Sequence, residues 1–355
     1  MSKYLENARI AFEKLRTKKD VTILAIESSC DETAISVVRN GREVLSNIVA
    51  SQIDIHKKFG GVVPEVASRN HVMAISGCYK EALKEANISE SDIDAIAVTY
   101  GAGLIGALLV GINFAKTLAY ALNLPLIAVS HVHGHISANY LSHLELEPPF
   151  VCLMVSGGHT ALLKVNDYTK LSLIGSTVDD SVGECFDKVA RVLGLSYPGG
   201  PNIDRLAKGG KNIIKFNYHE PLKDTFNFSF SGLKTAVVNF VHNHEQAGKE
   251  YNKADIACSF QEIVTDELSE KAVKCCLKED SKTLVVAGGV GANSRLREKL
   301  KEKSEKENIK VFFPDLKFCT DNAAMIGSMA YYYLKAGIGL SDLSLTGKPN
   351  VPISI

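Results

Sequence analysis

The sequence has no excess of charge of either sign, since its 355 residues include 40 Lys and Arg against 40 Asp and Glu. A protein that neutralises many phosphates usually shows a basic excess unless its basic residues form a patch, so the bulk charge identifies no nucleic-acid partner. Long apolar runs are also missing. No stretch approaches the roughly 18 apolar residues of a membrane span, and residues 1–20 lack the apolar core of a signal peptide. We therefore expect neither secretion nor membrane insertion.

Cysteines with the spacing of a metal site are absent as well. The eight cysteines include no C-x-x-C and no zinc-ribbon arrangement, so we interpret them as reduced, mostly buried thiols of a cytoplasmic protein. Hydrophobic residues make up 46% of the chain, which is an ordinary globular composition. The length exceeds that of a typical single domain and predicts two lobes of about 150 residues each.

The order of apolar segments predicts an α/β fold in which the same arrangement of strands and helices occurs in both halves of the chain. After a short helical extension over 1–20, we expect three antiparallel strands within 21–49, a helix over 65–86, and then alternating strands and helices. Beyond Pro148 and Pro149 the pattern repeats, with three strands, a helix, a loop at YPGGP, a helix over 259–278, a strand and a further helix. We predict two lobes, 21–147 and 148–320, that close around a central cleft lined by glycine-rich turns.

A histidine pair follows the apolar strand LPLIAVS, in the segment SHVHGH. On a helix, His131 and His135 would lie on one face with Cβ atoms about 5–6 Å apart, close enough to bind one metal ion. The alternative is that these histidines only cap the helix or pack. The segment is not the zinc-protease motif H-E-x-x-H, because Val132 stands in place of the Glu. Asp321, at the start of the helical segment TDNAAMIGSMAYYY, is the best third ligand, although it could instead be an N-cap.

Glycine-rich turns form a second group of candidates. VSGGHT at 155–160, YPGGP at 197–201 and VVAGGVGANSR at 285–295 each follow a predicted strand, and GAGLIG is the counterpart in the first half. Glycine lets the backbone approach a phosphate or sugar, and amides at a turn or helix start bind anions, so this group favours a nucleotide ligand. The sequence contains neither a Walker-type P-loop nor a Rossmann fingerprint.

Acidic residues at predicted element ends form a third group. Asp31 and Glu32 follow the first strand, and Asp187 and Asp204 flank YPGGP. Such carboxylates organise water, a metal or ribose hydroxyls when they lie near a cleft, but a single one is more often a turn or cap residue. The basic stretches at 56–61 and 298–310 could contact RNA phosphates or could be ordinary solvated surface.

These motifs together resemble one family. IESSCDETAISVV, FGGVVPEVASRNHV, SHVHGHISA, LMVSGGHTALL, GECFDKVARVLGLSYPGGP, FSFSGLKTA, VVAGGVGANSRLR and CTDNAAMIG occur in the order found in the tRNA adenosine threonylcarbamoyltransferases, called TsaD in bacteria and formerly described as glycoprotein endopeptidases. The resemblance covers residues 21 to about 335. It implies the actin/Hsp70/sugar-kinase (ASKHA) superfold, with two ribonuclease-H-like lobes around a central cleft and a C-terminal helix over 321–340 that completes the first lobe.

The resemblance also implies a reaction and its residues. The family transfers a threonylcarbamoyl group from threonylcarbamoyl-AMP to N6 of the adenosine 3′ of the tRNA anticodon, and AMP is released. Carried over by position, His131, His135 and Asp321 would bind one divalent metal ion, Fe²⁺ first and Zn²⁺ as the alternative. Asp31 and Glu32 would be catalytic. The substrate-binding positions would be Met154, Val155, Ser156, Gly157, Gly158, Asp187, Gly200, Asp204 and Asn293.

Partners and competing functions follow from the same comparison. The resemblance implies tRNA and threonylcarbamoyl-AMP as substrates, a TsaB-like paralogous subunit, a TsaE-like ATPase, and a cytoplasmic location. The main rival is a nucleotide-binding scaffold of the same superfold without chemistry, which would not need the three metal ligands. A metallopeptidase lacks its Glu, and a small-molecule kinase would have no use for the histidine pair in a magnesium-phosphate site.

Overall fold

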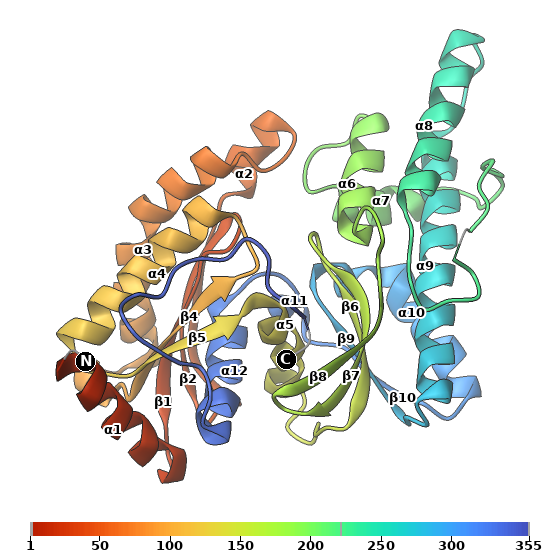
Figure 1. Ribbon diagram of the computed structural model, residues 1–355. Coiled ribbons are helices and arrows are strands. Elements are labelled where there is room, and N and C mark those ends of the chain that lie inside the picture. The colour runs from red at the N-terminus through yellow and green to blue at the C-terminus, as the bar shows by residue number, and fades with distance from the viewer. Residues whose placement is uncertain (1–2, 221, 354–355) are drawn as a thin grey trace. The chain divides into compact units, whose positions relative to one another are not determined.

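The structure is a computed structural model that describes residues 3–220 and 222–353. The chain divides into two compact units, shown in Figure 1. Unit 1 comprises Met1–Glu147 and Thr320–Ile355, and unit 2 comprises Pro148–Cys319. The chain therefore leaves unit 1, completes unit 2 and then returns to unit 1.

Unit 1 contains a six-stranded sheet in the order β11-β5-β4-β1-β2-β3. Its strands are β1 (Thr22–Glu27), β2 (Glu32–Arg39), β3 (Glu43–Ser51), β4 (Ala95–Gly101), β5 (Leu126–Ser130) and β11 (Leu340–Ser341). β1, β2 and β3 pair antiparallel, whereas β4 pairs parallel with β1 and β5 parallel with β4. The predicted antiparallel trio followed by parallel strands is confirmed. β1 is buried on both faces, as a central strand between parallel and antiparallel neighbours requires.

Helices cover both faces of this sheet. The helices of unit 1 are α1 (Lys3–Thr17), α2 (Ile53–His56), α3 (Pro64–Ala86), α4 (Ile105–Ala121), α5 (His131–Ser142) and α12 (Ala323–Ala336), with short 3₁₀ turns at Lys57–Phe59 and Glu90–Asp92. Leu24 and Ile26 of β1 pack with residues of α3 and α4. Ala25 points to the opposite face, where Gly327 of α12 lies against it. α12 in turn packs against α5 and α1.

Unit 2 repeats the sheet of unit 1. Its order is β10-β9-β6-β7-β8, with β6 (Phe150–Val155), β7 (Thr160–Asp167), β8 (Lys170–Ser176), β9 (Thr283–Ala287) and β10 (Lys310–Phe312). β6, β7 and β8 pair antiparallel, and β9 pairs parallel with β6 and with β10. The central strands correspond one for one with those of unit 1, which confirms the duplication predicted from the sequence.

The helices of unit 2 are α6 (Val182–Val192), α7 (Gly199–Ala207), α8 (Ser231–Gln246), α9 (Lys253–Lys278), α10 (Ser294–Lys306) and α11 (Leu316–Cys319), with a 3₁₀ turn at Gly289–Ala292. They include three that the sequence pattern did not predict, namely α7, α8 and α11. The interpretation of YPGGP as a loop after a strand is wrong, because it follows α6 and its last three residues open α7. Pro201 is tolerated there because the first amides of a helix need no intrahelical acceptor. α9 begins at Lys253 instead of residue 259, since Asn252 caps it by accepting from the Ala254 amide.

Two features of the whole chain complete the description. Each of the eight cysteines is a free thiol, in agreement with the absence of paired spacings. Among residues 3–220 and 222–353, the structure contains no helix with the length and apolar character needed to cross a bilayer.

Candidate metal centre

The predicted histidine pair lies at the start of α5, directly after β5. Ser130 ends the strand and is the N-cap residue, so His131 is the first helical residue and His135 lies one turn further along. The two imidazole rings meet edge to face, with centroids 4.6 Å apart and planes at 81°. Both side chains are buried, His131 at 8% and His135 at 2% exposure. The structure therefore confirms the prediction that His131 and His135 lie one helical turn apart.

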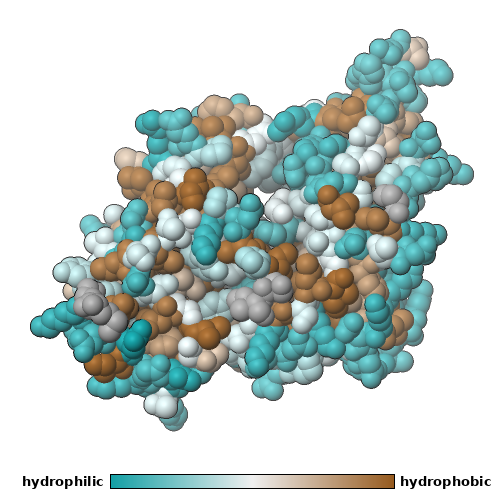
Figure 2. All heavy atoms as spheres, in the orientation of Figure 1, coloured by the Kyte–Doolittle hydropathy of each residue, from teal (hydrophilic) through white to brown (hydrophobic). Residues whose placement is uncertain are grey.

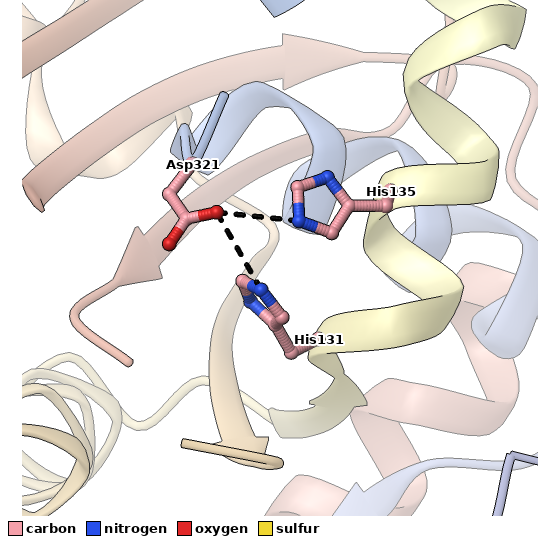
Figure 3. Close-up of side chains that lie close together, drawn as sticks. All are labelled: His131, His135 and Asp321. Atoms are coloured by element: carbon pink, nitrogen blue, oxygen red, sulfur yellow. Dashed lines mark ion pairs between the residues drawn. The ribbon is translucent and has the colours of Figure 1, made fainter. Parts of the chain in front are cut away.

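Asp321 completes the cluster, and it belongs to the C-terminal segment of unit 1 that begins at Thr320. Its Oδ1 lies 3.2 Å from Nε2 of His135 and 3.5 Å from Nε2 of His131 (Figure 3). One ligand atom from each of the three residues lies within 4.8 Å of the others. Asp321 is not the N-cap of α12, because Asn322 has that role and accepts from the Met325 amide. The alternative of a simple capping aspartate is thereby excluded.

The close packing of α5 on α12 explains how Asp321 reaches the histidines. A side chain at Gly134 would place its Cβ 2.7 Å from the Ile326 side chain, so glycine is required at this contact. One turn of α5 further on, the Ser137 hydroxyl donates to the Met325 carbonyl at 2.6 Å. Gly134 thus lets α12 approach α5 closely. As a result Asp321, the residue before the N-cap of α12, faces the two imidazoles.

A buried carboxylate orients His131. Nδ1 of His131 lies 3.0 Å from Oε2 of Glu27 and 3.1 Å from Oγ of Ser29. Glu27 ends β1, is fully buried, and also accepts from the Thr99 hydroxyl at 2.6 Å. Burial alone would raise the pKa of Glu27, but the neighbouring His131 outweighs it and lowers the pKa. The ionised carboxylate holds a ring proton on Nδ1, so Nε2, the ring nitrogen that faces Asp321, is the one left for a metal ion.

Sequence reasoning missed Glu27. The available signal was an acidic residue at the end of the apolar strand TILAIE, where an unpaired charge would be costly. Such a residue must have a buried partner, and His131 is that partner.

The donor set fits a divalent transition-metal ion. Two imidazole nitrogens and one carboxylate oxygen are the ligands that zinc and iron(II) accept, and three protein ligands leave positions open for a substrate. The electrostatics agree. Burial lowers the pKa of His131, but the charges of Asp321 and Glu27 outweigh it and raise the pKa to about 9. The site is thus organised to stabilise a positive charge between two carboxylates, which a bound cation would supply.

Asp31 and Glu32 lie beside this centre, with Asp31 in the turn after β1 and Glu32 as the first residue of β2. Asp31 is 4% exposed, and the Ser51 hydroxyl donates to Glu32 at 3.3 Å. Burial raises the pKa of Glu32 to about 10, and the negative charges of Asp321 and Asp31 add to this effect. These effects favour the neutral carboxyl of Glu32, which can donate a hydrogen bond, and the charge interaction with Asp321 places Glu32 next to the histidine cluster.

The predicted substrate-binding residues all lie in unit 2. Met154 and Val155 are the buried end of β6, and Ser156 begins the turn in which its amide donates to the His159 carbonyl at 2.8 Å. Gly157 and Gly158 are exposed, and a side chain there would point into open space. The turn therefore presents bare backbone at the carboxyl end of a central strand.

The remaining predicted positions surround that turn. A Cβ on Gly288, whose φ is +94°, would lie 2.4 Å from the Val155 carbonyl oxygen, so the second glycine-rich turn packs directly on the first. Asp187 of α6 accepts from the Gly199 amide at 2.7 Å, one residue before Gly200. The Ser294 hydroxyl donates to Oδ1 of Asp204 at 2.8 Å, and the side-chain amide of Asn293 donates to Oε1 of Gln261 at 2.8 Å. Asp187 and Asp204 thus lie on helices and tie the starts of α7 and α10 to their neighbours.

Solved structures with similar coordinates define the class of fold. The HypF protein of T. kodakarensis matches with a TM-score of 0.62 at 15% identity, over 92% of this chain and 49% of that one. Component A of the (R)-2-hydroxyglutaryl-CoA dehydratase of Acidaminococcus fermentans matches with a TM-score of 0.52 at 12% identity, over 89% of this chain and 98% of that one. These likenesses agree with the expected ASKHA superfold, and at such low identity they concern the fold alone.

Sequence comparison gives the family. The family model for TsaD, tRNA N6-adenosine threonylcarbamoyltransferase, matches residues 43–328. A protein of Clostridium perfringens with that name is 59% identical over 333 residues, which is 93% of this chain and 97% of the relative. One from Clostridium novyi is 54% identical over 340 residues, 94% of this chain and 98% of the relative. This chain belongs to the tRNA N6-adenosine threonylcarbamoyltransferase family.

Proposed function

We propose that this protein transfers the threonylcarbamoyl group of threonylcarbamoyl-AMP to N6 of the adenosine 3′ of the anticodon, in tRNAs that read codons beginning with A. The observation that carries the proposal is the convergence of His131, His135 and Asp321 in a chain that belongs to this family. In the reaction, N6 attacks the carbamoyl carbonyl carbon and loses one proton. The bond from that carbon to the phosphate oxygen breaks, and AMP leaves with the bonding electrons.

One divalent metal ion, Fe²⁺ first and Zn²⁺ as the alternative, fits the three ligands of unit 1. His131 and His135 would bind it through Nε2 and Asp321 through a carboxylate oxygen. When bound, such an ion supplies Lewis-acid stabilisation of negative charge on carbonyl or phosphate oxygens. Glu27 would not bind the ion itself. It keeps the His131 ring in the tautomer that leaves Nε2 available for the metal.

Asp31 and Glu32 are assigned to proton handling and charge stabilisation. The protonated Glu32 carboxyl can donate a hydrogen bond to an oxygen that gains negative charge as the amine attacks. Asp31, in the same turn, is the nearby acidic residue that can take the proton released from N6. For the amine to reach these groups, the adenosine must be unstacked from the anticodon loop, as single-stranded bases are in most sequence-specific RNA recognition.

The adenylate is assigned to the glycine-rich end of unit 2. Backbone amides of Ser156, Gly157 and Gly158 would bind the phosphate, since the exposed turn has no side chains in the way. Asp187 and Asp204 would accept hydrogen bonds from the ribose hydroxyls, and Asn293 would contact the nucleoside. Met154, Val155 and Gly200 would shape the same pocket. The packing of the two glycine-rich turns on each other supports this common location.

The proposal includes protein partners and a cytoplasmic location, where tRNA is modified. A TsaB-like subunit and a TsaE-like ATPase are the expected partners. Unit 1 offers an apolar surface for one of them, because Figure 2 shows brown side chains gathered over α3 and α4. Val72 and Leu109, 60% and 36% exposed, line a groove of about 470 Å³ between these two helices. Exposed apolar surface of this kind marks protein interfaces more often than free surface.

The decisive experiment mixes the purified protein and its partners with labelled threonylcarbamoyl-AMP and unmodified tRNA. We expect label in the tRNA and release of AMP. The His131→Ala variant should lose both bound metal and transfer, whereas His242→Ala, an exposed histidine of unit 2, should keep both. Full transfer by metal-free His131→Ala would remove the metal from the proposal. Tight adenylate binding without any transfer by the wild type would favour the non-catalytic scaffold instead.

A further inference from the structure

One histidine outside the metal centre holds the acidic turn from both ends. His71 lies in α3, within the segment ASRNHV, and its side chain is fully buried. Its Nε2 lies 2.9 Å from the carbonyl oxygen of Cys30, and its Nδ1 lies 2.8 Å from the hydroxyl of Thr33. The two contacts flank Asp31 and Glu32, so the ring bridges the end of the turn and the first residues of β2.

The hydrogen-bond roles in this bridge are fixed by chemistry. The Cys30 carbonyl can only accept, so Nε2 of His71 carries the proton and donates it. Burial lowers the pKa of His71, which keeps the ring neutral. Nδ1 is then an acceptor and takes the hydrogen bond of the Thr33 hydroxyl. Both nitrogens of a buried imidazole are satisfied, and both are used on the same turn.

The other supports of the turn reach it from β3 and the residue that follows. The backbone N–H of Gln52 donates to the Asp31 carbonyl at 3.1 Å, and Ser51 pairs with Glu32 in the β2–β3 ladder. These contacts fix the backbone of Asp31 and the beginning of β2. They do not fix the Cys30 carbonyl or the Thr33 side chain, which are the two groups that His71 holds. His71 therefore links the residue before Asp31 to the residue after Glu32, and it braces both carboxyl-bearing residues from the side of α3.

We propose that His71 is a positioning residue for the transfer reaction and acts through Asp31 and Glu32. This inference rests on the proposed function, in which those two carboxyl groups handle the proton and the developing charge. Because a displacement of about 1 Å in a reacting group can reduce a rate by as much as about 100-fold, loss of the bridge should lower kcat strongly. His71 has no contact with the metal ligands in the interactions described above, so metal content should not change.

The test uses a matched pair of substitutions at Thr33 with a companion pair at His71. Thr33→Val removes the hydroxyl and keeps the shape, whereas Thr33→Ser keeps the hydroxyl. We expect Thr33→Val to lower kcat roughly 10-fold or more at unchanged KM for threonylcarbamoyl-AMP and unchanged metal content, and Thr33→Ser to retain most of the activity. His71→Gln, whose amide can still donate to Cys30, should retain more activity than His71→Ala. Adding Thr33→Val to His71→Ala should cost little further, since both remove the same bridge.

A second readout separates this inference from the proposed function. Amide hydrogen exchange at residues 30–33 should be faster in Thr33→Val than in Thr33→Ser, while the thermal unfolding temperatures of the two stay close. If exchange in this turn and kcat are both the same in the two variants, the positioning role is wrong and the proposed function stands. If the wild type transfers nothing while exchange differs as expected, the proposed function fails and the bridge remains a structural fact. Equal losses of kcat and of thermal stability in both variants would also overturn the positioning role.

Discussion

Nδ1 of His131 lies 3.0 Å from the buried carboxylate of Glu27, although the two residues are 104 positions apart in the chain. Glu27 ends β1, and His131 begins the helix after β5, which lies two strands away in the sheet with β4 between them. The sheet therefore aligns a carboxylate behind the imidazole, on the side away from Asp321. This arrangement fixes the ring before any ligand arrives.

Replacing Glu27 should weaken metal binding without removing a ligand. In Glu27→Gln the neutral amide oxygen accepts the His131 Nδ1 proton more weakly than the carboxylate does, so we expect metal affinity to fall about 10- to 100-fold. The dissociation constant can be measured by competition with a chromophoric chelator. Glu43→Gln, at an exposed position on β3, is the control and should bind metal as the wild type does. Equal affinities for Glu27→Gln and the control would show that the carboxylate does not orient the ring.

Asp179 should stabilise the first turn of α8. Its Oδ1 accepts from the amides of Phe230 at 2.8 Å and Ser231 at 3.4 Å, where the N-cap residue supplies no side-chain acceptor of its own. Because this carboxylate acts as a helix cap from another segment, Asp179→Ala should lower the free energy of unfolding by about 1 kcal/mol. Urea denaturation measures the change. The exposed Glu302→Ala on α10 serves as the control, and an equal change in both variants would contradict the capping role.

The ionic cluster at Glu262 predicts a loss of stability in acid. Burial alone would raise the pKa of Glu262, but hydrogen bonds from Arg295 and Lys299 outweigh it and lower the pKa. A carboxyl whose pKa is lower in the folded state stabilises the fold above its unfolded pKa, and the contribution disappears as the pH falls through the folded pKa. Wild type should therefore exceed Glu262→Gln in unfolding free energy at pH 7, and the difference should shrink below about pH 4. Urea titrations at several pH values test this, and a pH-independent difference would refute it.

Helix α1 should contribute substantially to the stability of unit 1. Phe12 is 1% exposed, and Lys335 of α12 donates to the carbonyl oxygen of Leu15 at 3.2 Å near the end of the helix. Since truncation of a buried aromatic leaves a cavity, Phe12→Ala should lower the unfolding free energy by about 3 kcal/mol or more. Ile10→Ala, 52% exposed on the same helix, should change it little. Similar small effects at both positions would mean that α1 is only loosely attached.

Much of the framework follows from local sequence. The apolar strands, the helix over 65–86 and the one-turn spacing of His131 and His135 are local patterns, and the structure has each of them. Asp321 was identified by chemistry, as the best oxygen donor for two imidazoles. Its distance from His131 could not come from spacing, because the contact depends on α12 packing against α5 at Gly134.

The groups that support the site could not be predicted, for a related reason. Glu27 and His71 look like ordinary strand and helix residues in the sequence, and their roles depend on partners 104 and 38 residues away. The YPGGP error has another origin. Glycine and proline usually mark a loop, but a Cβ at Gly199 would lie 2.6 Å from the Asp187 Cα. That glycine serves the contact between two helices, which no local rule for turns detects.

The path of the chain has a consequence for biosynthesis. The polypeptide leaves unit 1 after Glu147 and re-enters it at Thr320, so the third ligand, Asp321, is made after all of unit 2. A nascent chain on the ribosome carries the two imidazoles long before the carboxylate exists. The three-residue cluster can be completed only once unit 2 has been synthesised, so a nascent chain that ends before Thr320 holds the two imidazoles without their carboxylate.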